Sequence, residues 1–135
     1  MTELGAKIIK LHNEGKSYNE ICDLLGCSKS TISYWCNSDV QKATKRRFHD
    51  RRNKIVKLVQ KIKSKTPCAE CGKKYPYYVM QFDHLPQYEK KFTIGNARGN
   101  AMSIHKVEEE IKKCDIVCAN CHTIRTWRRK NGGLS

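Results

Sequence analysis

The hydrophobic and polar positions of residues 3–37 follow the period of an α-helix in three short runs. In the first run, Leu4, Ile8 and Leu11 recur every three or four residues, and Gly15 follows them. This spacing places the apolar side chains on one face, and the glycine favours a helix end. The pattern predicts short helices that bury their apolar faces against one another.

Two further helices are indicated by residues at their ends. Ser17 and Glu20 have the spacing of a capping box, and Gly26 follows the apolar run that they open. Ser28 can cap a third helix, in which Trp35 faces inward. Two helices joined by a tight turn that contains glycine are typical of a helix-turn-helix. The spacing resembles the DNA-binding segment of resolvase-like recombinases and of many phage regulators.

In this interpretation residues 28–34 form the recognition helix. Its candidate DNA-binding side chains are short hydroxyls, an ammonium group and a phenol, which bond to base edges and phosphates. They are Ser28, Lys29, Ser30, Thr31, Ser33 and Tyr34. The alternative is a capped surface helix in a protein-interaction module.

Residues 39–65 read as one long basic helix, or as a helix with a break near His49. Residues 39–67 hold eleven Lys and Arg against two Asp, a net charge of +9. Such a helix can lie along DNA phosphates, or it can be a solvated tether between domains. The candidate DNA-binding residues in it are Arg46, Arg47, Arg51 and Arg52.

The last part of the chain mixes strand and helix patterns. Residues 77–82 are β-branched and aromatic, which predicts a strand that ends at Asp83 and His84. A second strand with loops is expected within 85–102, a helix over 103–113, and a final helix from within 118–122 through Trp127. The predicted fold class is α+β. Its domains are a helix-turn-helix at 1–38, a basic linker helix at 39–66 and a zinc-stapled module at 67–135.

Charge and hydropathy narrow the partners and the compartment. The 135 residues carry a formal net charge of +14 with a pI near 9.6. This imbalance favours a polyanion, and double-stranded DNA is the expected partner. We expect no signal peptide and no membrane span, because the first residues are polar and no apolar run is long enough. The chain is therefore expected in the cytoplasm, in a bacterial host.

Eight cysteines in a reducing compartment indicate metal ligands rather than disulfides. Cys68 and Cys71 form one Cys-x-x-Cys knuckle, and Cys118 and Cys121 form another, 46 residues further on. Four thiolates are the donor set of a structural zinc site. The gap exceeds that of a zinc ribbon, so a segment is inserted between the two halves.

The cysteines allow other interpretations. Cys114 can replace one ligand, but it has no partner at knuckle spacing. The run that ends in His122 also matches the attachment motif of c-type haem, which leaves the first knuckle unexplained. Small buried apolar side chains are the default interpretation of Cys22, Cys27, Cys36 and Cys114.

The insert contains Asp83-His84, and the second knuckle runs directly into His122. The order of strand, Asp-His, loop and a helix opened by Cys-x-x-Cys-His resembles the HNH endonucleases, the ββα-metal nucleases. The resemblance covers about residues 68–130 and rests on residues 82–84 and 117–125. A helix-turn-helix fused to such a module is similar to phage homing endonucleases.

The resemblance implies a role for each matching residue. His84 would be the general base that deprotonates the attacking water, and Asp83 and His122 would hold one magnesium or manganese ion. The products would carry 5′-phosphate and 3′-hydroxyl ends. Arg125, one helical turn beyond His122, is a candidate phosphate contact, and a solvent-facing helix arginine is the equal alternative. The family's middle asparagine stays unassigned among Asn96, Asn100 and Asn120.

The resemblance therefore implies a site-specific, metal-dependent DNA endonuclease or nickase. A non-enzymatic regulator with a helix-turn-helix and a zinc ribbon is the alternative, and a resolvase-like recombinase is a third. Sequence does not decide between monomer and homodimer, and so does not decide between a nick and a double-strand break.

Overall fold

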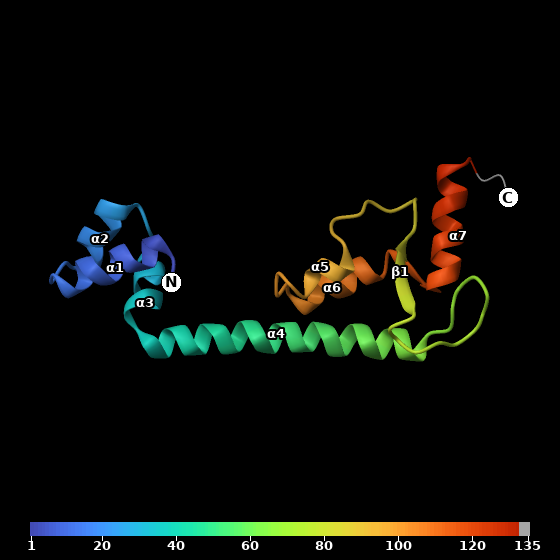
Figure 1. The fold of residues 1–135 in the computed structure, drawn as a ribbon, viewed down its shortest axis with the longest axis horizontal. Helices are drawn as coiled ribbons and strands as arrows, with labels where there is room; N and C mark the ends of the chain where they lie inside the picture. Colours follow the sequence, from blue (N-terminus) through green and yellow to red (C-terminus); the bar gives the residue numbers. More distant parts are fainter. Residues whose placement is uncertain (133–135) are drawn as a thin grey trace. The chain divides into compact units, whose positions relative to one another are not determined.

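The computed structural model describes residues 1–132. The chain divides into two compact units, Met1–Phe48 and a second that begins at His49 (Figure 1). The first is all helical, and the second combines helices with a two-stranded sheet. The fold is thus α+β. Residues 133–135 of the expected 67–135 module lie outside the described residues.

The first unit begins with three short helices, α1 (Glu3–Asn13), α2 (Tyr18–Leu25) and α3 (Lys29–Cys36). Each contributes one fully buried isoleucine to a common core: Ile8, Ile21 and Ile32. Cys22, Cys27 and Cys36 pack against this core as partly buried side chains. The three predicted helices and the apolar interpretation of these cysteines are confirmed.

Local signals in the sequence explain where these helices begin and end. Ser17 and Glu20 form the complete capping box that opens α2. Gly26 ends α2 with φ +64°, in the left-handed region that favours glycine. Ser28 accepts a hydrogen bond from the backbone N–H of Thr31 and so caps α3.

The next helix, α4 (Ser38–Lys65), begins in the first unit and ends in the second. It is continuous through His49, so the break that we considered there is absent. Beyond His49, Ile55 is buried and forms a core with Ala97 and Val107, against which Leu58 also packs. The apolar stripe thus gives the second unit part of its core. No helix within residues 1–132 is long and apolar enough to cross a membrane.

The sheet of the second unit pairs β1 (Met80–His84) with β2 (Cys114–Cys118) in antiparallel register. Asp83 lies opposite Asp115, and His84 opposite Cys114. Three helices complete the unit: α5 (Ile94–Ala97), α6 (Ile104–Ile111) and α7 (Ala119–Lys130). A second core beneath the sheet includes Cys68, Met80 and Val117.

The expected second strand within 85–102 is wrong. That segment forms turns and the short helix α5, and the strand lies instead at Cys114–Cys118. Its β-branched residues Ile116 and Val117 are buried in the sheet. The first strand also starts later than predicted, because Tyr77 to Val79 form a turn in which Val79 N–H donates to the Pro76 carbonyl at 3.0 Å.

Candidate functional site: a thiolate cluster beside a histidine cleft

The four knuckle cysteines come together although 46 residues separate the two pairs. Cys68 and Cys71 lie in the turn after α4, Cys118 ends β2, and Cys121 lies in the first turn of α7. Their sulfur atoms all lie within 4.8 Å of one another. Thiolates bound to one zinc at about 2.3 Å lie about 3.8 Å apart. The cluster can therefore hold a structural metal such as zinc.

The chemistry of these thiols fits the same conclusion. Burial by itself would raise the pKa of Cys68, yet backbone N–H groups of Cys71, Cys118 and Glu70 donate to its sulfur and lower that pKa. The pKa of Cys121 is raised by its hydrogen bond with Cys118, by burial and by the other thiols. A bound cation would offset the repulsion between thiolates held this close together.

Cys114 is not part of this cluster. Burial, followed by the nearby charges of Glu110 and Asp83, raises the pKa of its thiol to about 11. Among the described residues, only the four knuckle cysteines form a group that could hold a metal ion. The replacement of a knuckle cysteine by Cys114 has no support in the geometry.

A cleft of about 520 Å³ beside the cluster is lined by Asp83, His84 and His122 together. Asp83 and His84 end β1, and His122 lies in the first turn of α7. Asp83 is only 3% exposed, and its Oδ1 lies 3.6 Å from Nε2 of His122. The fold thus brings the three residues of the two sequence motifs to one opening. None of the three asparagine candidates lines it.

Two arginines of α7 bind the carboxylate of Asp83. Arg129 donates to both oxygens at 2.7 and 2.9 Å, and Arg125 donates at 3.0 Å. Burial alone would raise the pKa of Asp83, but these hydrogen bonds outweigh burial and lower it. Asp83 is thus a stable carboxylate with two cationic partners.

The spacing of Asp83 and His122 was tested against one divalent cation. Two ligands of one magnesium ion at about 2.1 Å each are separated by at most about 4.2 Å. The 3.6 Å between Oδ1 and Nε2 meets this limit. Arg129 competes for the same oxygen, and its side chain is partly exposed. The donor set therefore fits a cation if Arg129 gives up one of its bonds.

Arg125 joins three segments rather than pointing to solvent. Its guanidinium bonds to Glu70 of the first knuckle, Asp83 of β1 and Asp115 of β2, at 2.8 to 3.0 Å. Burial lowers its pKa, but the three carboxylates together raise it. The interpretation as a solvent-facing helix arginine is not supported. A phosphate contact by Arg125 stays a prediction.

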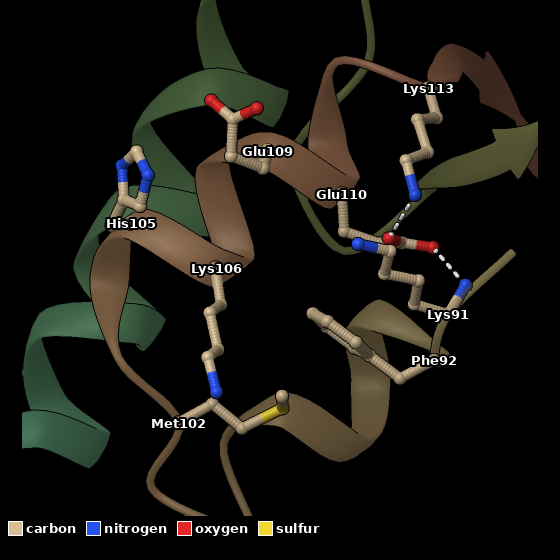
Figure 2. A pocket seen from close by; sticks show the side chains of 8 residues that line it. All are labelled: Lys91, Phe92, Met102, His105, Lys106, Glu109, Glu110 and Lys113. Atoms are coloured by element: carbon tan, nitrogen blue, oxygen red, sulfur yellow. Dashed lines mark hydrogen bonds and ion pairs between the residues drawn. The ribbon is translucent and has the colours of Figure 1, made fainter.

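A buried glutamate holds the second histidine of the cleft. Oε1 of Glu110 lies 3.0 Å from Nε2 of His84 and accepts the backbone N–H of Lys91 at 2.9 Å. Its other oxygen accepts from Lys113 at 2.8 Å (Figure 2). Glu110 is 1% exposed, and it also lines the separate 480 Å³ cavity drawn in Figure 2. Burial would raise its pKa, but its three donors lower it to about 2.

Glu110 and Arg129 were missed from the sequence, although each had a signal. Glu110 lies three residues after Val107 and next to Ile111, so it falls on the apolar face of its helix. Arg129 lies four residues after Arg125 and seven after His122, which places the three on one face. A charged residue on such a face needs a buried partner.

The other candidate DNA-binding residues lie on α3 and α4, and Arg51 and Arg52 among them belong to the second unit. Ser28, Lys29 and Ser30 are exposed at the start of α3, and the hydroxyl of Ser28 bonds to those of Ser30 and Thr31. Thr31, Ser33 and Tyr34 are half-buried. On α4, Arg46, Arg47 and Arg51 are exposed and Arg52 is half-buried.

Residues 6–38 match the family model of a homeodomain-like domain. They cover most of α1, all of α2 and α3, and the start of α4. The first unit therefore contains a helix-turn-helix, which indicates DNA binding. The comparisons with curated proteins and with solved structures gave no match.

Proposed function

We propose that the chain is a metal-dependent DNA endonuclease or nickase of the HNH type, similar to phage homing endonucleases. The observation that carries the proposal is the cleft in which Asp83, His84 and His122 meet beside the four-thiol cluster. The two sequence motifs have no evident reason to meet at one opening in a regulator. The helix-turn-helix at residues 6–38 supports DNA as the substrate.

His84 is the general base in this proposal, and Glu110 decides which nitrogen acts. An ionised Glu110 only accepts hydrogen bonds, so Nε2 of His84 carries the proton in their 3.0 Å bond. The lone pair then lies on Nδ1, which has no hydrogen-bond partner within the described chain. Nδ1 can take a proton from water, and the carboxylate of Glu110 stabilises the imidazolium that results.

Asp83 and His122 are the ligands that we assign to a magnesium or manganese ion. The chemistry supplied there would be neutralisation of the scissile phosphate and of the leaving 3′ oxygen. Arg125 keeps Asp83 ionised and in place through its bonds to Glu70 and Asp115. Among the described residues Arg129 pairs with no carboxylate besides Asp83, so it can turn from Asp83 to a phosphate oxygen.

The zinc cluster has a positioning role in the proposal. Cys118 and Cys121 flank the junction of β2 and α7, and His122 follows directly. Holding this junction against the first knuckle fixes His122 relative to β1, which pairs with β2. Catalysis requires such placement within a fraction of an ångström.

The direct test compares His84→Ala with His105→Ala, an exposed histidine of α6 outside the cleft. Both variants should bind DNA and retain zinc like the wild type. Loss of a general base should slow nicking by about a hundredfold or more, whereas His105→Ala should cut normally. Equal cleavage by the two variants would remove His84 from the mechanism.

One observation favours the alternative of a non-enzymatic DNA-binding regulator. Asp83 already has Arg125 and Arg129 as partners, as a purely structural carboxylate would. If Asp83 is purely structural, Asp83→Asn should destabilise the second unit. It should then cause no change in how magnesium or manganese affects the DNA, because the regulator does not use such an ion. Tight DNA binding with no nicking under magnesium or manganese would decide for the regulator.

A further inference from the structure

The candidate catalytic cleft continues into a second hollow of the same unit. This neighbouring cavity, of about 270 Å³, lies between α4, the turn before β1 and the segment around α5. Four residues line both cavities, so the two cavities form one groove. The shared residues are Lys63, Phe82, Ile94 and Gly95.

Three aromatic rings line the far part of this groove, together with four aliphatic side chains of α4 and α5. Tyr77 and Tyr78 line it and are 41% and 74% exposed, with their ring centroids 5.5 Å apart at 82°. Phe82 lies at the passage between the cavities. The ammonium group of Lys63 lies over its ring in a cation–π contact, 5.1 Å from the ring centroid. Exposed rings in a groove offer flat surfaces on which nucleobases stack.

The charges of the groove match a phosphate backbone. Lys63 and Arg98 line the far cavity, and no aspartate or glutamate lines it. Neither cation has a carboxylate partner within the described residues. Burial lowers the pKa of Lys63, so an anion beside it would be stabilising. Aromatic faces with interspersed cations suit a nucleotide better than an apolar peptide.

Gly95 keeps the passage open without any structural need for glycine. It lies in α5, where glycine weakens a helix relative to alanine. A Cβ built there would approach only the Thr93 side chain, at 4.0 Å, and its backbone is not in the left-handed region. A side chain at this position would project into the space that joins the two cavities.

From these observations we propose that the groove binds an unpaired nucleotide of the substrate strand next to the scissile phosphate. Its base stacks on the face of Tyr78, the more exposed of the two perpendicular rings, and its phosphates lie near Lys63 and Arg98. Paired bases expose only their edges, so a duplex cannot use this platform unless a base leaves the stack. The inference rests on the proposed nuclease function, and it makes DNA with a single-stranded stretch beside the cut the preferred substrate.

The test is a binding measurement without added magnesium or manganese, so that no cleavage occurs. The probes are a fluorescein-labelled blunt duplex and the same duplex with a short single-stranded tail that carries 2-aminopurine beside the junction. The wild type should bind the tailed duplex at least about fivefold more tightly. The fluorescence of 2-aminopurine should fall as its base stacks.

Two pairs of variants locate the effect. Tyr78→Ala and Gly95→Gln should lose the tail preference and the fluorescence change. Tyr88→Ala and Gly99→Gln alter an exposed tyrosine and a glycine outside the groove and should retain both. Equal binding of the two probes by the wild type, or an equal loss for both probes in Tyr78→Ala, would overturn the proposal.

The outcome is independent of whether the chain cuts DNA. If the wild type prefers the tailed probe but nicks no DNA, the nucleotide-binding groove is supported and the nuclease function is contradicted. If the wild type nicks DNA but shows no preference for the tailed probe, the nuclease function is supported and the nucleotide-binding groove is contradicted.

Discussion

Glu110 and Arg125 are each a single charge that holds three partners. Glu110 bonds to His84, to the backbone of Lys91 and to Lys113. Arg125 donates hydrogen bonds to three carboxylates, those of Glu70, Asp83 and Asp115. A buried charge that loses its partners costs several kcal/mol, so these two residues should be more sensitive to substitution than the exposed charges around them.

Replacement of Glu110 tests its effect on His84. Glu110→Gln keeps the shape but removes the charge that stabilises the imidazolium, so we expect nicking to slow by about tenfold to a hundredfold with little loss of DNA binding. Glu109→Gln is the matched control, because Glu109 is exposed and forms its ion pair with the exposed Lys112 rather than with His84. Similar rates for the two variants would exclude a role for Glu110 in the reaction.

The same residue gives a pH dependence with a defined sign. Its pKa is lowered in the fold from an ordinary 4.5 to about 2. The ionised form therefore stabilises the fold above about pH 4.5, and that contribution is lost as the pH falls towards 2. The difference in unfolding free energy between wild type and Glu110→Gln should be constant at neutral pH and shrink with acidification. A difference that grows on acidification would contradict the assignment.

Loss of Arg125 should destabilise the second unit. Arg125→Met leaves Glu70, Asp83 and Asp115 without their shared cation, and we expect a loss of about 3 kcal/mol in unfolding free energy, measured with urea. Arg128→Met is the control, since Arg128 is more exposed and, among the described residues, pairs with one carboxylate, that of Glu70 at 3.5 Å. Equal midpoints for the two variants would show that the three-carboxylate cluster contributes nothing.

At the scale of elements, local signals were readable and long-range pairing was not. The capping box of Ser17 and Glu20 and the glycine that ends α2 act within a few residues, so the sequence alone predicted the helix-turn-helix. The strand at Cys114–Cys118 exists because it pairs with Met80–His84, 30 residues earlier. No local pattern identifies that partner, and the turns of 85–102 were mistaken for it.

The candidate site likewise combines local motifs that the sequence predicts with long-range contacts that it does not. Metal-ligand spacing within each knuckle, and the Asp-His and Cys-x-x-Cys-His motifs, were visible in the sequence. The bond from His84 to Glu110 spans 26 residues, and the bonds of Asp83 to Arg129 span 46. Such contacts depend on the packing of α6 and α7 against the sheet, which periodicity does not specify.

The four-thiol cluster can hold a zinc ion, and we expect this ion to be the main support of the second unit, whose sheet has two strands of five residues each. A chelator such as 1,10-phenanthroline, or Cys118→Ser, should unfold this unit and leave the three-helix unit folded. Circular dichroism and proton NMR would follow the two units separately. Cys114→Ser is the control and should change little; an intact second unit after removal of zinc would show that the metal is dispensable.

The start of α3 provides an element-scale test of DNA binding. Lys29 is exposed there and has no carboxylate partner among the residues described. Lys29→Ala should weaken binding and lower the slope of log affinity against log salt by about one. Lys7→Ala, which removes an ion pair with Glu3 on α1, should leave the slope unchanged. Identical slopes for wild type and Lys29→Ala would remove α3 from the phosphate contacts.

At the scale of the whole molecule, charge and site chemistry point to the same substrate. The net charge of +14 favours a polyanion, and the homeodomain-like segment indicates that this polyanion is DNA. In the proposed function, His84 as general base and the metal ligands Asp83 and His122 would act on a phosphodiester of this DNA. The proposed function depends on cleavage taking place, because DNA binding alone is also expected of a regulator.

The most direct measurement incubates the zinc-loaded chain with supercoiled plasmids that carry randomised inserts, so that the target need not be known. Open circles should form with magnesium or manganese and not without a divalent ion, and DNA ligase alone should reclose them, as 5′-phosphate and 3′-hydroxyl ends require. Plasmids that stay supercoiled under every divalent ion, although the protein is bound to them, would contradict the nuclease and leave a DNA-binding regulator.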